Sequence, residues 1–435
     1  MTAGVPRVGR RGRARALVAV LALAGALGPL GASAAAAVAA GPPTPSLLPT
    51  ATSECTPEVV TYVEATPPAL TRLGAAQAWD LATGAGVVVA VVDSGVDTGN
   101  VHLTDAVLPG VDLVEGTPAG HTDTAGHGTA IAGQIAARPD ERSGVIGLAP
   151  GATILPVRVY VADDDQAREL GTAPRTDRIA EGIRYAVDNG ARVINVSISS
   201  TVDDPALREA VRVATERGAL VVASAGNRNT AQDTSDSPRY PAAYDEVLAV
   251  AALDDADRVT DDSIHGAHVD VAAPGTNVLT TYHAAGDCML AGGEASTSFA
   301  TAYVSAAAAL LVERFPDETP AQWAHRLEVT AARYDVDARD DRWGWGAIRP
   351  ALALAFVDDG SAPGPPSPVH EAPPAVETEP QVLGLGVHED ALAPAQDLTV
   401  WWVLGVSVVC VGALLASRLT PRRARPRPSA GKTGP

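Results

Sequence analysis

Basic side chains are scarce in most of this 435-residue chain, although both of its ends are basic. Residues 1–40 carry five Arg and residues 398–435 carry five Arg and one Lys, and neither end contains an acid. Because the formal net charge of the whole chain is -19, residues 41–397 carry about -30. A surface this acidic repels phosphates, so the composition argues against nucleic acid as a partner.

Internal repeats and EF-hand loops are also absent from the sequence. His265 and His268, in HGAH, are metal-ligand types, but no further ligand cluster stands near them in sequence. The acidic loops ADDDQ (162–166) and DARDD (337–341) match no calcium-loop pattern, and solvated surface charge explains them. We therefore predict no metal site and no cofactor, and structural calcium is left without support.

Residues 1–40 have the pattern of an export signal. Five arginines, the apolar run ALVAVLALAGAL and the small-residue stretch GASAAAAVAA follow one another in that order. The apolar run is shorter than the ~20 residues that a membrane span needs, so we expect cleavage within residues 32–40 rather than an uncleaved anchor. Residues 41–70 follow as a Pro-rich, irregular N-terminal extension.

The stretch LTVWWVLGVSVVCVGALLAS (398–417) contains 20 residues and no charge, which predicts one transmembrane helix. The basic residues 418–435 follow it directly. Because positive residues stay on the cytoplasmic side, this tail is predicted to be cytoplasmic and the rest of the mature chain extracellular. Residues 358–397 are rich in Pro, Gly, Ala and acids, and we predict an extended linker there.

The chain has three cysteines. Cys410 lies in the predicted span, whereas Cys55 and Cys288 both lie on the predicted extracellular side. Disulfides form and persist outside the cell, so one bridge between these two is possible. The residues themselves leave its formation open.

Between residues 70 and 357, apolar runs alternate with amphipathic segments. GVVVAVVD (86–93) is a continuous β-branched run, typical of a strand buried on both faces. Strands separated by helices favour parallel pairing, so we predict a single α/β domain over residues 71–357, a doubly wound, mostly parallel sheet with helices on both faces. The other predicted strands cover residues 152–160, 191–199, 219–227 and 246–253, and the predicted helices cover residues 178–190 and 206–218.

Four polar residues stand where predicted strands end or helices begin, which is where function gathers in such a sheet. Asp93 and Asn227 close strands. His127 and Ser298 open helical segments. A histidine can take the proton of a serine hydroxyl, a buried carboxylate can orient that histidine, and a side-chain amide can donate to an oxyanion. These types predict nucleophilic catalysis, although each one alone is also explained as a turn former, a surface residue or an N-cap.

Four short motifs give these residues a family context. VVDSGVD, HGTAIAG, ASAGN and STSFATAYV, in that order, resemble the motifs of the subtilisin-like serine proteases over about residues 73–353. Within that family the chain is most similar to the mycosins, membrane-anchored proteases that accompany type VII secretion in actinobacteria. RLGAAQAWDLATGAGVVVAVVDSGVD, VLPGVDLV, GVIGLAPGATILPVRV and PDETPAQWAHRLEVTA carry the second resemblance, together with the signal, linker, span and tail.

The resemblance implies a serine endopeptidase that hydrolyses peptide bonds through an acyl-enzyme. It implies a triad of Asp93, His127 and Ser298. It implies Asn227 in the oxyanion hole. It also implies two walls of a cleft in which an extended peptide pairs with backbone. These walls are Ser197, Ile198 and Ser199 on one side, and Ser224, Ala225 and Gly226 on the other.

The sequence departs from the family pattern in three places. The distance from the signal to Asp93 is too short for the large propeptide of secreted subtilisins, which favours a short wrapping extension. The cysteine that mycosins place just before the His motif is missing from HTDTAGHGT, which leaves Cys288 as the external candidate partner of Cys55. Ser296 and Ala302 replace Gly and Pro around the serine, and a Ser at 296 is expected to shift the nucleophile if the position needs the conformational freedom of Gly.

Two other readings stay open at this point. The chain is then a protease-fold structural component of a secretion complex with little or no activity, or a general cell-surface subtilase that degrades proteins. The predicted partners are a protein or peptide substrate, the membrane through one C-terminal span, and a type VII secretion membrane complex.

Overall fold

The computed structural model describes residues 55–228, 233–371 and 393–419. The predicted signal, the predicted tail beyond residue 419 and parts of the predicted extension and linker lie outside the described residues.

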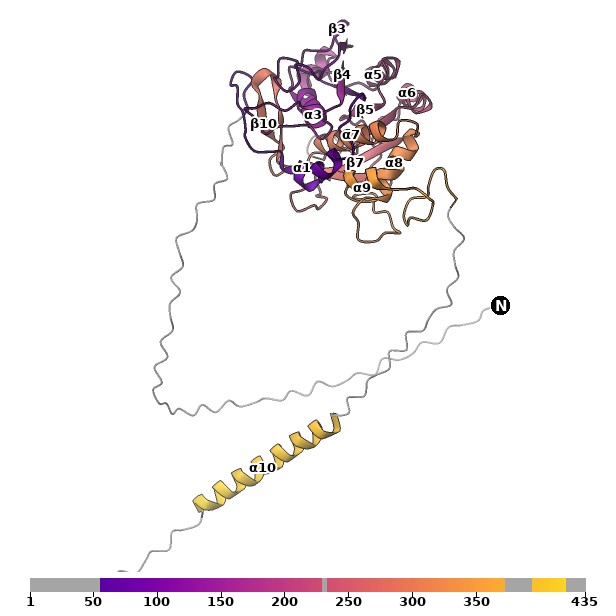
Figure 1. Ribbon diagram of the computed structural model, residues 1–435. Helices are drawn as coiled ribbons and strands as arrows, with labels where there is room; N and C mark the ends of the chain where they lie inside the picture. Colours follow the sequence, from indigo (N-terminus) through magenta and orange to yellow (C-terminus); the bar gives the residue numbers. More distant parts are fainter. Residues whose placement is uncertain (1–54, 229–232, 372–392, 420–435) are drawn as a thin grey trace, which may run out of the picture. The chain divides into compact units, whose positions relative to one another are not determined.

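A central sheet organises the domain, and its strands are those that the apolar runs predict, with additional short strands at its edges. The strands are β1 (Val88–Asp93), β2 (Gly110–Asp112), β3 (Thr117–Ala119), β4 (Thr153–Arg158), β5 (Val193–Val196), β6 (Leu220–Ser224), β7 (Val247–Leu253) and β8 (Val271–Pro274). Their order across the sheet is β3-β2-β4-β1-β5-β6-β7-β8. Figure 1 labels β3, β4, β5 and β7 of this sheet. All neighbours are parallel except β2 and β3, which confirms the prediction of a mostly parallel sheet. A separate antiparallel pair consists of β9 (Val278–Thr281) and β10 (Asp287–Leu290).

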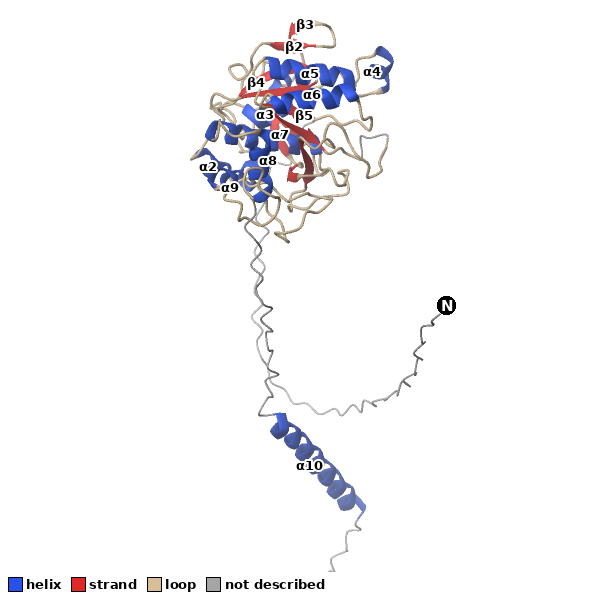
Figure 2. Cartoon of the chain, turned by 90° about the vertical axis from the view of Figure 1, so that its right-hand side faces the viewer, coloured by secondary structure: helices blue, strands red, loops and turns tan. Residues whose placement is uncertain are grey.

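Helices cover both faces of this sheet, as expected for a doubly wound fold. Helices α5 and α6 lie side by side on one face (Figure 2), and α3 and α7 pack together on the other. The helices of the domain are α1 (Pro68–Arg72), α2 (Ala75–Trp79), α3 (His127–Ala136), α4 (Asp165–Leu170), α5 (Thr176–Asp188), α6 (Pro205–Glu216), α7 (Thr297–Arg314), α8 (Pro320–Val329) and α9 (Pro350–Ala355), with a 3-10 turn at His283–Ala285.

Strand β1 shows why its sequence has no polar alternation. Val89 and Val91 belong to the core cluster beneath α3 and α7, whereas Ala90 and Val92 belong to the cluster beneath α5 and α6. All four side chains are fully buried. A strand buried on both faces has no solvent side on which to place polar residues. Its last residue, Asp93, is therefore the first polar group at the carboxyl edge of the sheet.

The domain continues past residue 357, where the sequence predicts the linker to begin. Arg333 Nη2 donates to the carbonyl oxygen of Pro363 at 3.0 Å, and Ser367 Oγ donates to Asp358 Oδ2 at 2.6 Å. Pro365 is buried. Residues 358–371 thus contact the domain, and the extended linker over residues 358–397 stays a prediction. A Pro-rich chain lacks N–H donors but keeps its carbonyl oxygens, and here Arg333 binds that of Pro363.

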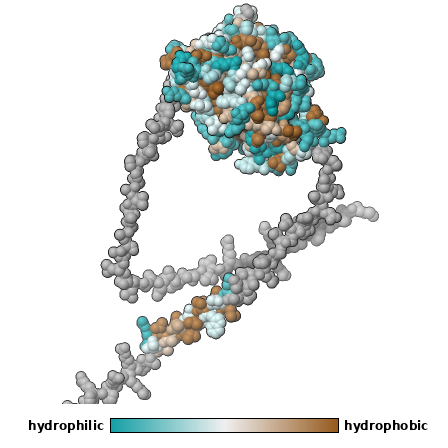
Figure 3. All heavy atoms as spheres, viewed as in Figure 1, coloured by the Kyte–Doolittle hydropathy of each residue, from teal (hydrophilic) through white to brown (hydrophobic). Residues whose placement is uncertain are grey.

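Helix α10 (Ala393–Leu419) is described by itself. Its stretch Leu398–Leu419 has 22 residues, and an 18-residue window within it has a mean hydropathy of 2.3 and is not buried against other described residues. Figure 3 shows that hydrophobic residues make up most of this helix. It is long and apolar enough to cross a bilayer, so it fits a membrane anchor.

Candidate active site

A cleft of about 790 Å³ lies beyond the carboxyl ends of the central strands. Three of the four residues predicted for the chemistry line it, namely His127, Asn227 and Ser298. Asp93 lies beneath the surface and is fully buried. The sheet thus brings together side chains that are far apart in the sequence, at the edge where an α/β fold places its function.

The first pair in the cleft joins β1 to α3. His127 Nδ1 lies 2.8 Å from Asp93 Oδ1, and its side chain is 26% exposed toward the cleft. Because the carboxylate can only accept, Nδ1 carries the proton and Nε2 is left as the basic nitrogen. Gly128 makes the pair possible, since a Cβ there would lie 2.1 Å from the carbonyl oxygen of Gly95. Helix α3 can therefore begin directly against the end of β1.

The charge environment tunes this histidine. Burial alone lowers the pKa of His127, but the charge of Asp93, the hydrogen bond to it and the charge of Asp123 together raise the pKa above its ordinary value. A raised pKa makes the neutral imidazole a stronger base. It also means that the base is protonated, and so lost, at a higher pH.

Two residues that hold the pair were missed in the sequence. Tyr160 donates its hydroxyl to Asp93 Oδ1 at 3.0 Å and lies 3.3 Å from His127 Nδ1. Burial and the charge of Asp93 raise the pKa of Tyr160 well above its ordinary value, so it stays a donor. The signal for it was an aromatic residue with a polar tip at the end of a predicted strand.

Asp123 is the second residue missed, and it fixes the turn before α3. Its Oδ1 accepts from Ser94 Oγ at 2.9 Å and from the N–H of Gly126 at 2.8 Å. Its Oδ2 accepts from the N–H and the hydroxyl of Thr129 at 2.9 and 2.6 Å. A buried carboxylate with this many donors holds the backbone on both sides of His127. An acid four residues before the histidine was the available signal.

Ser298 is the second residue of α7, and 8% of it is exposed. Its Oγ donates to the carbonyl oxygen of Ser197 at 3.1 Å, and Ser197 Oγ donates back to the carbonyl oxygen of Ser298 at 3.0 Å. The hydroxyl therefore rests on one predicted wall of the cleft. It lies in the same cleft as His127.

Ser296 does not need the freedom of a glycine. As the N-cap of α7 it has φ -112° and ψ 122°, an extended backbone that any residue adopts. Its side chain makes no capping hydrogen bond. The replacement of the family's Gly therefore adds no backbone strain before Ser298.

A chain of hydroxyl groups orients the amide of Asn227. Thr297 donates to Asn227 Oδ1 twice, through its N–H at 2.8 Å and its hydroxyl at 2.9 Å. Ser224 Oγ lies 2.6 Å from Thr297 Oγ1, and because the Thr297 proton is already used, Ser224 is the donor. With Oδ1 occupied, the Nδ2 donors of Asn227 are the ones available to a ligand in the cleft, as an oxyanion hole requires.

The two predicted walls are only partly in the cleft. Ser197, Ile198, Ser199 and Ser224 line it, whereas Ala225 and Gly226 do not. The side chain of Ala225 packs in a small core cluster, and its N–H donates to the carbonyl oxygen of Val250. The part of Ala225 and Gly226 in substrate binding stays a prediction, which their backbone rather than a side chain in the cleft would have to fulfil.

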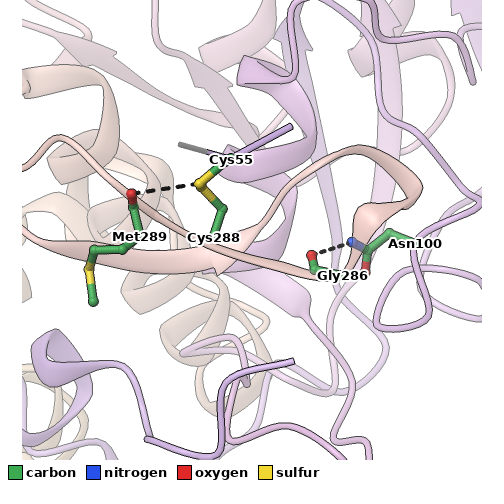
Figure 4. Close-up of a disulfide and its surroundings, with 5 residues drawn as sticks. All are labelled: Cys55, Asn100, Gly286, Cys288 and Met289. Carbon is green, nitrogen blue, oxygen red and sulfur yellow. Dashed lines mark hydrogen bonds between the residues drawn. A yellow bond between two sulfur atoms is a disulfide. The ribbon is translucent and has the colours of Figure 1, made fainter. Parts of the chain in front are cut away.

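The disulfide of the structure lies away from the cleft. Cys55 is bonded to Cys288 on β10, with their Cα atoms 5.8 Å apart (Figure 4). Nearby, Asn100 donates to the carbonyl oxygen of Gly286 at 2.8 Å. The extension is also held by Thr61, whose N–H donates to the carbonyl oxygen of Ala285 at 2.8 Å. Residues after Cys55 therefore wrap along the domain.

The predicted histidines of HGAH lie in a second cavity of about 470 Å³. His265 Nε2 is 3.2 Å from the carbonyl oxygen of Thr260, and His268 Nε2 is 3.4 Å from that of Ala225. Across residues 55–228, 233–371 and 393–419, the structure has no group of three or more His, Cys, Asp or Glu side chains arranged for a metal ion. Each histidine therefore contacts a backbone carbonyl oxygen of the domain.

Comparison with known proteins identifies the family. The model of the subtilase family matches residues 84–346. The chain belongs to the subtilase family. Thermitase of Thermoactinomyces vulgaris is 40% identical over 286 residues, which cover 66% of this chain and 94% of that protein. Mycosin-1 of Mycobacterium tuberculosis is 36% identical over 355 residues, which cover 71% of this chain and 78% of that protein.

Solved structures agree with this assignment. MycP1 from Mycobacterium smegmatis is 31% identical with a TM-score of 0.62, over 73% of this chain and 92% of that one. MycP1 from the ESX-1 type VII secretion system is 31% identical with a TM-score of 0.62, over 72% and 92%. The predicted resemblance to subtilases and mycosins is confirmed, and this subtilase is a serine endopeptidase.

Proposed function

We propose that this subtilase is a membrane-anchored extracellular endopeptidase that uses Asp93, His127 and Ser298 as its triad and works beside a type VII secretion complex. The pairing of His127 Nδ1 with Asp93 Oδ1 at 2.8 Å carries the proposal, because it leaves Nε2 basic and facing the cleft that Ser298 also lines. The mycosin relatives and the apolar helix α10 support the location.

The proposed reaction begins when Ser298 Oγ leaves the carbonyl of Ser197 and turns toward His127 Nε2. His127 takes the hydroxyl proton as Oγ attacks the carbonyl carbon of the scissile peptide bond. Asp93 stabilises the imidazolium that results. The oxyanion receives donors from Asn227 Nδ2 and from the backbone N–H of Ser298 at the start of α7. His127 then protonates the leaving amine, and water releases the acyl group by the same steps in reverse.

A fluorophosphonate probe tests the catalytic part of the proposal on the full chain in detergent. We expect labelling of the wild type, loss of labelling in Ser298→Ala, and retention in the matched control Ser296→Ala. Absence of labelling in a wild type with an intact thermal transition would refute the proposal that Ser298 is a catalytic nucleophile. It would favour instead the reading of a structural component of a secretion complex, which the resting contact of Ser298 with Ser197 also suits.

The proposed topology has a separate test. Lys432 is the sole lysine of the chain and lies in the predicted cytoplasmic tail. A membrane-impermeant amine reagent should leave Lys432 unmodified in intact cells and modify it after the cells are opened, as read by mass spectrometry. Modification in intact cells would reverse the orientation. Cross-linking of the anchored chain, followed by identification of the captured proteins, tests the association with a secretion complex.

A further inference from the structure

A buried arginine lines the cleft close to Asn227. Arg239 lines the same cleft as Ser298, yet only 1% of it is exposed. Its stem packs against Gly226, because a Cβ placed on Gly226 would be 3.1 Å from Arg239 Cγ and 3.2 Å from Ser199 Oγ. Ser199 and the stem of Arg239 therefore both lie against Gly226 and leave little room beside it for another side chain.

The guanidinium of Arg239 is bound by its own loop rather than aimed at a ligand. Nη2 donates to the carbonyl oxygens of Asp233 and Ser235 at 2.6 and 3.1 Å. Nη1 donates to the carbonyl oxygen and the hydroxyl of Ser237. A substrate carboxylate that drew the guanidinium away would break these hydrogen bonds, which costs free energy. Among the described residues, no carboxylate forms an ion pair with it.

The charge around the pocket also disfavours an acidic substrate residue. The carboxyl of Asp233 lines the cleft, and hydrogen bonds from the side chain and backbone of Ser235 lower its pKa, so it is ionised at neutral pH. An acidic side chain would approach this negative charge. The part of the cleft beside Gly226 and Arg239 therefore offers little room for a large substrate side chain and no free cation for an acidic one.

We propose that Arg239 determines the specificity of the cleft by filling the pocket for the residue whose carbonyl is attacked, so that the enzyme cleaves after small side chains. This residue, P1, must place its carbonyl at Asn227, and Gly226 is the neighbour of Asn227. The P1 side chain then points toward Ser199, Gly226 and the stem of Arg239. The inference rests on the proposed function, since it assumes attack by Ser298.

The test uses the full chain in detergent and fluorogenic peptides that differ only at P1, as Ala, Ser, Leu, Phe or Glu. For the wild type we expect kcat/KM to be at least about tenfold higher for Ala and Ser than for Phe and Glu. Arg239→Gly should raise kcat/KM for Leu and Phe at least about tenfold relative to Ala. Arg239→Met keeps an aliphatic stem without the charge, so it should retain the preference of the wild type for small residues.

Each outcome separates this inference from the proposed function. A wild type that reacts with fluorophosphonate but cleaves after Phe as fast as after Ala refutes the role of Arg239 alone. Fastest cleavage after Glu, lost in Arg239→Met, also refutes it and shows recognition by charge. If Arg239→Gly does not fold, the profiles of the wild type and Arg239→Met still decide. A wild type that neither labels nor cleaves refutes the proposed function and this inference with it.

Discussion

Adding one methyl group at Gly275 should slow this enzyme much more than restoring the family's glycine at Ser296. A Cβ on Gly275 would lie 2.6 Å from the carbonyl oxygen of Ser296 and 3.2 Å from its nitrogen. The N–H of Ser296 also donates to the carbonyl oxygen of Gly275 at 3.0 Å. The position at which backbone approaches backbone closely is thus Gly275, which contacts the segment directly before Ser298.

The expected size follows from that contact. A Cβ rarely comes within about 3.0 Å of a carbonyl oxygen, so Gly275→Ala moves the Ser296 segment by several tenths of an ångström or more. Displacements of about 1 Å at reacting atoms cost on the order of 100-fold in rate. We expect kcat/KM to fall about 10- to 100-fold. Ser296→Gly loses no cap bond and should leave kcat/KM within about twofold, with a stability loss of a few tenths of a kcal/mol.

The assay measures the rate of fluorophosphonate labelling and kcat/KM on one peptide for the wild type and both variants, with thermal unfolding as the control for folding. Gly275→Ala that melts like the wild type but labels slowly would support the reasoning. Equal rates for Gly275→Ala and the wild type would refute it. A loss of activity in Ser296→Gly would instead show that Ser296 itself has a role.

Three further predictions concern the charge pair and the disulfide. The kcat/KM of the wild type should fall as the pH drops through the raised pKa of His127, because only the neutral imidazole accepts the serine proton. The midpoint of this acid limb of the pH profile should lie above pH 6.5, and a midpoint well below pH 6 would contradict the prediction. Tyr160→Phe should move that limb up by as much as about one pH unit, since Asp93 then loses a donor and stabilises the imidazolium more strongly. Cys55→Ser should lower the free energy of unfolding by up to about 5 kcal/mol, given the 233-residue separation from Cys288, and an unchanged melt with and without reductant would refute it.

The elements of the sheet could be predicted from the sequence because their signal is local. The run at 246–253 became β7 (Val247–Leu253), and the run at 86–93 became β1 (Val88–Asp93). Continuous apolar runs identify strands buried on both faces wherever they lie in the chain. Since parallel strands end at one edge of their sheet, the sequence alone predicted that Asp93 and Asn227 lie at the same edge.

The parts that could not be predicted depend on contacts between distant segments. Arg239 is an ordinary basic residue in the sequence, and only folding places its stem against Gly226 and Ser199. The direction of the Ser298 hydroxyl is set by Ser197, which is 101 residues away. The composition of a segment reports only the conformation that the segment prefers on its own. It therefore also missed the docking of residues 358–371, where Arg333 supplies the donor.

The Cys55–Cys288 bridge has a topological consequence for a chain that cuts peptide bonds. It closes a ring that contains Asp93, His127 and Asn227, while Ser298 and helix α10 follow the ring along the same chain. One cut anywhere between the two cysteines opens the ring without dividing the molecule. Both fragments would remain one covalent body attached to α10, and only a reducing gel would separate them.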